Sequence, residues 1–220
     1  MKNGKLTAII PVREGSERVK NKNIKPFAGK TLLEIKIELL KRVDGLDAIV
    51  VSSDSLLMLD MAKKLGVNTH LRDDYYASGK VNNSEFMYNL ADETVSDYIM
   101  YSPVTSPLLS SETVTECITK FMHSDINNIV TATSQKHHMW LEGKPINYDI
   151  RNSPNSQDLP DIVSVNYGCC ILSKEDMLDC KNVVTSNPTF YITDEIESID
   201  IDTEFDFMVA EFIYEKIYNV

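Results

Sequence analysis

Short runs rich in β-branched residues alternate with helical patterns over most of the chain. The apolar and alternating runs predict strands at 6–11, 47–53, 67–72, 97–102, 128–133, 163–172 and 197–202. Apolar residues at three- and four-residue spacing predict helices over 31–43 and 56–66, and Gly66 is a typical C-cap for the second. Strands that alternate with helices form a mainly parallel sheet, so we predict an α/β, Rossmann-like fold with helices on both faces.

One segment departs from this alternation. Residues 134–160 are polar, contain three prolines and show no helical period. Such an excursion from a sheet is either a flap or an arm that packs on a second subunit. We therefore predict one domain over 1–220 with a small protruding arm, 134–166, inserted in it.

Composition and charge restrict the partners. Acidic residues outnumber basic ones by 33 to 22, and the formal net charge is −11. DNA, RNA and anionic membranes favour basic surfaces, so we expect neither a nucleic acid nor a membrane as partner. The first apolar run ends before Arg13 and is too short for a signal peptide. The four cysteines have no CxxC pair or zinc spacing, which favours reduced thiols in a cytoplasmic protein.

The loop after the first predicted strand is basic against this acidic background. In an open parallel sheet, ligands bind beyond the carboxyl ends of the strands. Gly15 and Ser16 offer backbone N–H groups for an anion nest, and basic side chains supply charge around it. The spacing matches neither the dinucleotide nor the Walker motif. Charge alone allows a solvated loop equally well, but the place after the first strand favours a polyphosphate site. The basic residues of the loop are Arg13, Arg18, Lys20, Lys22 and Lys25, opposed by Glu14 and Glu17.

This loop, 11-PVREGSERVKNKNI-24, resembles the N-terminal nucleotide-binding motif of the acylneuraminate cytidylyltransferases, A-R-x-x-S-K-G-x-x-x-K-N. Those enzymes make CMP-activated sialic acids and related keto acids. Glu17 stands where the motif has a lysine, and Arg18 follows it. Similar segments follow in the family's order at 49–55, 66–78, 105–112, 157–168 and 198–211, so the resemblance covers nearly the whole chain. Together with the charge pattern it implies a nucleotide site at Arg13, Gly15, Ser16, Arg18, Lys22, Asn23 and Arg72. It also implies a homodimer, because the family uses such an arm for dimerisation.

Two aspartates near the C-terminus alternate with isoleucines in 198-SIDIDT-203. In a strand, Asp200 and Asp202 would point to one face, about 7 Å apart. Thr203 and Asp206 have the spacing of a capping box that begins a helix. The alternation alone is also typical of an exposed strand face. With the basic loop and the resemblance, it predicts that Asp200 and Asp202 bind Mg²⁺, which takes one or two carboxylates plus phosphate oxygens and water.

The departures from the family concentrate at its sugar-acid end. An ungapped alignment puts Pro103, Leu109 and Ser164 where the family has a glutamine and two arginines. A serine cannot replace the charge of a guanidinium that binds a carboxylate. The resemblance implies that CTP is coupled to an acidic sugar, a sialic-acid-like ulosonic acid, to give a CMP-sugar. The departures favour an acceptor that differs from the common sialic acid. The residues predicted to contact it are Lys80, Ser102, Asn166 and Tyr167.

The resemblance implies attack by an acceptor oxygen on the α-phosphorus of CTP, with release of pyrophosphate. Positioning and charge neutralisation supply most of the acceleration in such reactions. We assign these roles to Arg13, Lys22, Asp200 and Asp202. Two alternatives stay open: a nucleotidyltransferase for another nucleotide or a phosphorylated or phosphonylated acceptor, and a noncatalytic nucleotide-binding protein. The paired aspartates weigh against the second alternative.

Overall fold

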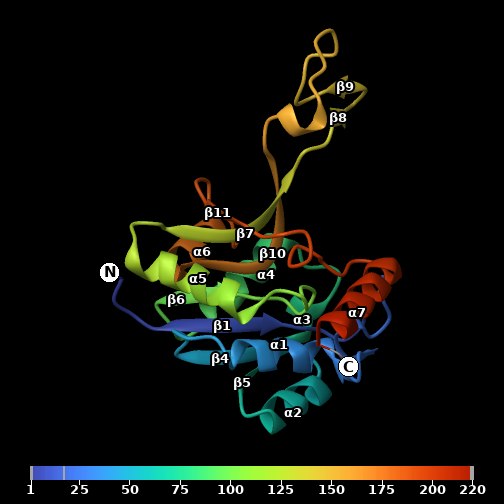
Figure 1. Cartoon of the computed structure of the whole chain (residues 1–220). Helices are drawn as coiled ribbons and strands as arrows, with labels where there is room; N and C mark the ends of the chain where they lie inside the picture. The colour runs from blue at the N-terminus through green and yellow to red at the C-terminus, as the bar shows by residue number, and fades with distance from the viewer. Residues whose placement is uncertain (1, 17, 219–220) are drawn as a thin grey trace.

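The chain folds around one seven-stranded sheet and forms two small hairpins, one of them in an arm that projects away from the sheet (Figure 1). The computed structural model describes residues 2–16 and 18–218, so the departure at Glu17 lies outside the described residues. The strand order is β11-β7-β10-β6-β1-β4-β5. Its strands are β1 (Leu6–Pro11), β4 (Ala48–Ser53), β5 (Asn68–Leu71), β6 (Tyr98–Tyr101), β7 (Asn128–Gln135), β10 (Ile162–Ser173) and β11 (Thr189–Ile192). β10 is antiparallel to both its neighbours, and the other pairs are parallel, so the predicted mainly parallel sheet is confirmed.

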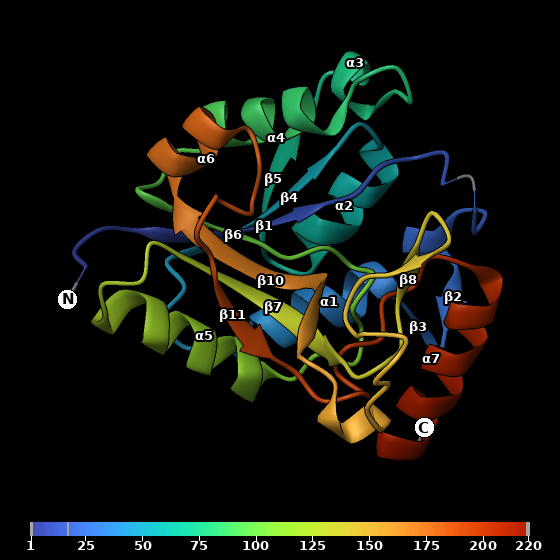
Figure 2. The same ribbon diagram turned by 90° about the horizontal axis from the view of Figure 1, so that it is seen from above.

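Helices cover both faces of this sheet, as predicted (Figure 2). Alternation along β1 directs Leu6, Ala8 and Ile10 into one apolar layer and Ile9 into the other. The first layer contains side chains of α1 (Leu32–Leu40), α2 (Leu56–Lys64), α5 (Ser111–His123) and α7 (Glu204–Tyr218). The second contains side chains of α4 (Asn83–Asp92) and α6 (Lys174–Cys180). The short helix α3 spans Asp74–Ala77, and β2 (Pro26–Phe27) and β3 (Lys30–Thr31) form a hairpin before α1.

Local sequence explains where the predicted helices begin and end. Thr31 Oγ1 accepts the Glu34 N–H at 3.2 Å, and the Thr31 N–H donates to Glu34 Oε2 at 2.7 Å, which completes a capping box at the start of α1. After α2, Gly66 has a φ of +75°, which glycine adopts without strain. Both predicted helices are confirmed, each ending two or three residues before the predicted limit.

The predicted strand over 197–202 is wrong. This segment has no strand neighbour, and the sheet edge on this side is β11 instead. The Ile201 N–H donates to the Thr105 carbonyl at 2.9 Å, but no ladder of hydrogen bonds continues along the segment. Isoleucine and aspartate alternate here because Ile201 is buried in the core while the segment itself is irregular. No strand aligns Asp200 and Asp202 in this segment, and the geometry of the loop decides how they lie.

The polar segment leaves the sheet as an arm (Figure 1). It contains the hairpin of β8 (Trp140–Leu141) and β9 (Lys144–Pro145), and a 3₁₀ turn at Ser156–Asp158. Its base is narrower than predicted, because 134–135 belong to β7 and 162–166 belong to β10, where Ile162 pairs with Gln135. Within the described residues, no helix is long and apolar enough to cross a membrane.

Candidate active site

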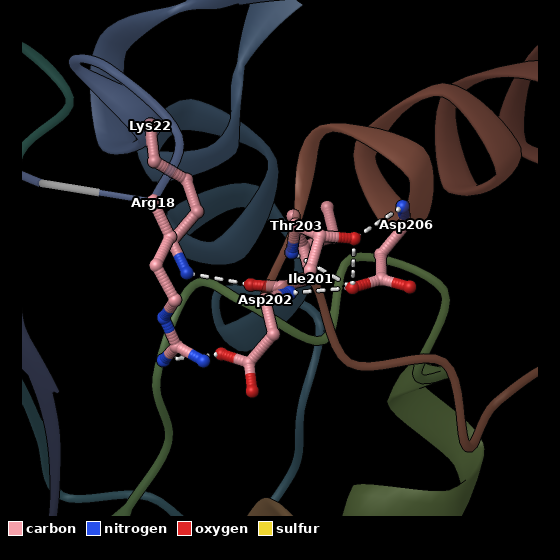
Figure 3. Close-up of polar contacts among 6 residues, drawn as sticks. All are labelled: Arg18, Lys22, Ile201, Asp202, Thr203 and Asp206. Atoms are coloured by element: carbon pink, nitrogen blue, oxygen red, sulfur yellow. Dashed lines mark hydrogen bonds and ion pairs between the residues drawn. The ribbon is translucent and has the colours of Figure 1, made fainter.

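Two segments that are far apart in the sequence meet beside the carboxyl end of β1. Arg18 Nη2 lies 2.7 Å from Asp202 Oδ1, and Lys22 Nζ donates to the Ile201 carbonyl at 2.5 Å (Figure 3). The basic loop and the Asp200–Asp202 segment are therefore in direct contact, as the sequence predicts.

The start of α7 fixes the backbone of Asp202. Asp206 Oδ2 accepts the N–H of Asp202 at 3.1 Å and that of Thr203 at 2.8 Å (Figure 3). Thr203 Oγ1 accepts the Asp206 N–H at 3.2 Å, so the predicted capping box is confirmed. A buried amide fixes the other segment, because Asn23 Nδ2 donates to the Arg13 carbonyl at 2.9 Å.

A cleft of about 610 Å³ lies against the basic loop. We call it the basic cleft. Its lining includes six of the seven residues predicted to bind nucleotide: Arg13, Ser16, Arg18, Lys22, Asn23 and Arg72. The seventh, Gly15, has a φ of +78°, the left-handed conformation expected of a turn glycine. A volume of this size is in the range of small-molecule sites.

Arg72 forms an inner wall of the basic cleft. Its guanidinium is buried, donates from Nη2 to the Val12 carbonyl at 2.6 Å and lies 5.1 Å from the centre of the Phe86 ring. Burial lowers the pKa of Arg72, and the nearby Asp54 opposes that shift. Nε and Nη1 have no hydrogen-bond partner among the residues that the structure describes. Buried donors of this kind need an acceptor, so this wall is suited to a polar ligand atom.

The ionisable groups where the two segments meet affect one another. Burial lowers the pKa of Lys22, while the charges of Asp200 and Asp202 act in the opposite direction. Burial also raises the pKa of Asp200, and the charge of Asp202 adds to the rise. The nearby Thr105 side chain and the charge of Lys22 oppose this rise. Asp200 is thus a carboxylate whose negative charge is disfavoured by burial and by the neighbouring Asp202.

The two aspartates fit a phosphate-assisted cation site. In the described part of the chain, no three His, Cys, Asp or Glu side chains come together as metal ligands, so the protein alone offers no complete cage. Mg²⁺ needs only one or two carboxylates when phosphate oxygens and water complete its shell. The raised pKa of Asp200 beside Asp202 is the electrostatic condition that such a cation relieves.

The four residues predicted to bind the acceptor divide into two pairs. The Ser102 hydroxyl donates to the Gly168 carbonyl at 3.1 Å, and the Asn166 amide donates to Thr193 Oγ1 at 2.9 Å, so both support the fold around β10. Lys80 and Tyr167 are exposed. Lys80 lies between Gly79 and Val81, which line the basic cleft. Tyr167 has a φ of +55°, a strained value for an aromatic residue.

Several cleft residues were missing from the sequence prediction. Tyr101, Tyr76 and Phe86 also line the basic cleft. Tyr101 ends β6, the neighbour of β1, and position at a strand's carboxyl end was a signal available in the sequence. Tyr76 and Phe86 belong to helices α3 and α4, whose approach to the loop is a tertiary feature.

Comparison with known families identifies the family to which this chain belongs. A family model described as cytidylyltransferase matches residues 7–140, more than half of the chain. The chain belongs to the cytidylyltransferase family. This match confirms the prediction that the chain is a nucleotidyltransferase enzyme of the cytidylyltransferase type.

Curated relatives share moderate sequence identity with this chain. Post-translational flagellin modification protein B of Campylobacter coli is 25% identical over 96% of the chain and 95% of its own length. N-acylneuraminate cytidylyltransferase of Escherichia coli is 25% identical over 96% of the chain, which spans only 52% of that enzyme. Pseudaminic acid cytidylyltransferase of Campylobacter jejuni is 30% identical over 59% of the chain and 58% of its own length.

Solved structures agree on the fold. A CMP:2-keto-3-deoxy-manno-octonic acid synthetase complexed with CTP superposes with a TM-score of 0.73 at 11% identity, covering 97% of this chain and 99% of that one. The 4-diphosphocytidyl-2C-methyl-D-erythritol synthase of Anaerococcus prevotii gives 0.70 at 16% identity, covering 96% and 98%. At these identities the likeness confirms the fold alone.

Proposed function

We propose that this family member couples CTP to an acidic keto sugar of the sialic-acid type. An oxygen of the acceptor forms a bond to the α-phosphorus, the bond from that phosphorus to the bridging oxygen breaks, and pyrophosphate leaves. The observation that carries the proposal is the contact of Arg18, which lines the basic cleft, with Asp202, which lies outside its lining. The names of the curated relatives support an acidic sugar as acceptor.

The basic loop binds the triphosphate in this proposal. Arg13, Ser16 and Lys22 line the basic cleft and offer two charges and a hydroxyl to phosphate oxygens. Arg18 and Asp202 pair through side chains that are 67% and 46% exposed. An exposed pair of this kind contributes at most about 1 kcal/mol, so Arg18 can exchange Asp202 for a phosphate at little cost.

Asp200 and Asp202 are the residues that would hold Mg²⁺. Bound there, the ion would supply charge neutralisation for the triphosphate. Arg72 and Asn23 contact the nucleoside, and the unpartnered Nε and Nη1 of Arg72 are the donors for it.

The acceptor is read by Lys80 and Tyr167 in this proposal, because Ser102 and Asn166 are engaged within the protein. We also propose a homodimer formed through the arm. Four of its apolar side chains are half exposed or more: Trp140, Leu141, Ile146 and Ile150. A second copy of the chain would remove this apolar surface from water.

A pyrophosphate-release assay tests the proposal. The protein is supplied with Mg²⁺, each of the four nucleoside triphosphates and a panel of acidic keto sugars and phosphorylated or phosphonylated acceptors. We expect release with CTP and an acidic keto sugar, and a loss of orders of magnitude in Asp202→Ala with an unchanged fold. Binding of CTP without release by any acceptor favours a noncatalytic nucleotide-binding protein. Wild-type turnover of Asp202→Ala would refute the metal assignment.

A further inference from the structure

A lysine is wholly buried in the helical layer that contains α1. Lys36 lies in the middle of α1, and its exposed fraction is 0%. Its Nζ donates to the Ser106 carbonyl at 3.1 Å, and no second acceptor for this ammonium occurs within residues 2–16 and 18–218. A buried ammonium with one neutral acceptor is less stable than an apolar side chain of similar volume. Stability of the core therefore does not account for this lysine.

The acceptor of Lys36 belongs to a loop that supports Asp200. Ser106 follows Thr105, whose carbonyl accepts the Ile201 N–H at 2.9 Å. The Thr105 side chain is also near enough to Asp200 to lower the pKa of that carboxyl. Hydrogen bonds therefore connect Lys36 through residues 105–106 to Ile201, the residue that follows Asp200.

The electrostatic environment of Lys36 points to the same segment. Burial lowers the pKa of Lys36 to about 8, and Cys169 and Asp200 oppose the shift. The Cys169 thiol stays protonated, because the neighbouring Cys117 and burial raise its own pKa well above the usual value. Asp200 is then the negative charge within reach of Lys36. The charge of Lys22 lowers the pKa of Asp200 more than the charge of Lys36 does. Lys36 therefore acts mainly by holding the loop in position.

We propose that Lys36 is a positioning residue, which clamps residues 105–106 against α1 and so fixes the Asp200–Asp202 segment for a divalent cation and triphosphate. This inference rests on the proposed function of Asp200 and Asp202. Lys36 is buried, and it contacts neither the nucleotide nor the acceptor. Residues that support metal ligands from behind commonly change metal affinity or activity 10–100-fold, roughly, when they are replaced.

The test compares Lys36→Met with the control Ile37→Met, its buried neighbour on α1. Binding of Mn²⁺ in the presence of CTP is measured by electron paramagnetic resonance, without any acceptor. We expect Lys36→Met to bind Mn²⁺ roughly 10–100-fold more weakly. Lys36→Met removes a buried charge, which stabilises the fold, and the donor to Ser106, which destabilises it. The thermal midpoint of Lys36→Met should therefore stay within about 4 °C of that of the parent. Ile37→Met should bind Mn²⁺ as the parent does.

Wild-type Mn²⁺ binding by a folded Lys36→Met overturns the inference. If Lys36→Met does not fold, Lys36→Leu decides, since it also removes the donor to the Ser106 carbonyl and is a residue that helices favour. Weakened Mn²⁺ binding there supports the clamp, and unchanged binding overturns it. A parent that binds neither Mn²⁺ nor CTP refutes the proposed function and this inference together. A parent that binds both, beside an unchanged Lys36→Met, refutes this inference alone.

Discussion

The capping box at the start of α7 affects both the stability of the fold and the position of Asp202, so one substitution can test both effects. Asp206 Oδ2 accepts three hydrogen bonds: from the Asp202 N–H at 3.1 Å, and from the Thr203 N–H and hydroxyl at 2.8 Å each. Asp206→Ala removes all three hydrogen bonds. The two backbone N–H groups at the start of the helix then have water as their acceptor. The same change releases the backbone of Asp202, whose side chain we assign to the cation.

The magnitude follows from the exposure of this cap. Loss of an N-cap interaction costs about 0.5–2 kcal/mol, and the freed donors are exposed enough to bind water. We expect a loss of about 1–2 kcal/mol in the free energy of unfolding. For a chain of this length, 1 kcal/mol shifts the thermal midpoint by about 2–4 °C, so the midpoint should fall by about 2–8 °C. Pyrophosphate release at 25 °C, where the variant is still folded, should fall as well.

Circular dichroism and the pyrophosphate assay measure the two effects separately. Glu215→Ala, an exposed change on the same helix, is the matched control and should alter neither quantity. Asp206→Asn keeps an oxygen acceptor and should recover part of both. If Asp206→Ala has the midpoint and turnover of Glu215→Ala, the cap neither stabilises the helix nor positions Asp202.

Three further changes test other parts of the site. Lys22→Ala removes one charge from the basic cleft and should weaken CTP binding roughly 10–100-fold by calorimetry, since a hydrogen bond to a charged group contributes about 1.5–3 kcal/mol; unchanged affinity would exclude a phosphate role. The pKa of Asp200 is raised in the folded state, so its ionisation destabilises the fold increasingly as the pH rises above the unfolded value of 3.8. Asp200→Asn should therefore be more stable than the parent to urea at pH 7.5, and the difference should vanish below that value; a pH-independent difference would contradict the argument. Replacing residues 137–158 by a short Gly-Ser turn should give a folded monomer by light scattering, and a persistent dimer would place the interface elsewhere.

The sequence by itself determined the sheet, the family and the chemistry of the basic loop. Period-two and helical patterns predicted β1, β4, β6 and α1 close to their observed limits, because burial of one face against a neighbouring layer imposes those periods. Position after the first strand placed the basic loop at the carboxyl edge of the sheet. Local rules also sufficed for the two capping boxes, whose partners are three residues apart.

Only the tertiary structure decided how distant residues meet. The 197–202 segment alternates like a strand, but alternation records which side chain is buried and not whether a sheet neighbour exists. The helical pattern of α1 gave no reason to treat Lys36 as interior, because its burial depends on the loop at 105–106. Likewise, the hydrogen bonds of Ser102 and Asn166 join positions that are 66 and 27 residues apart, respectively. Contacts over such distances depend on how the layers pack, which no local pattern encodes.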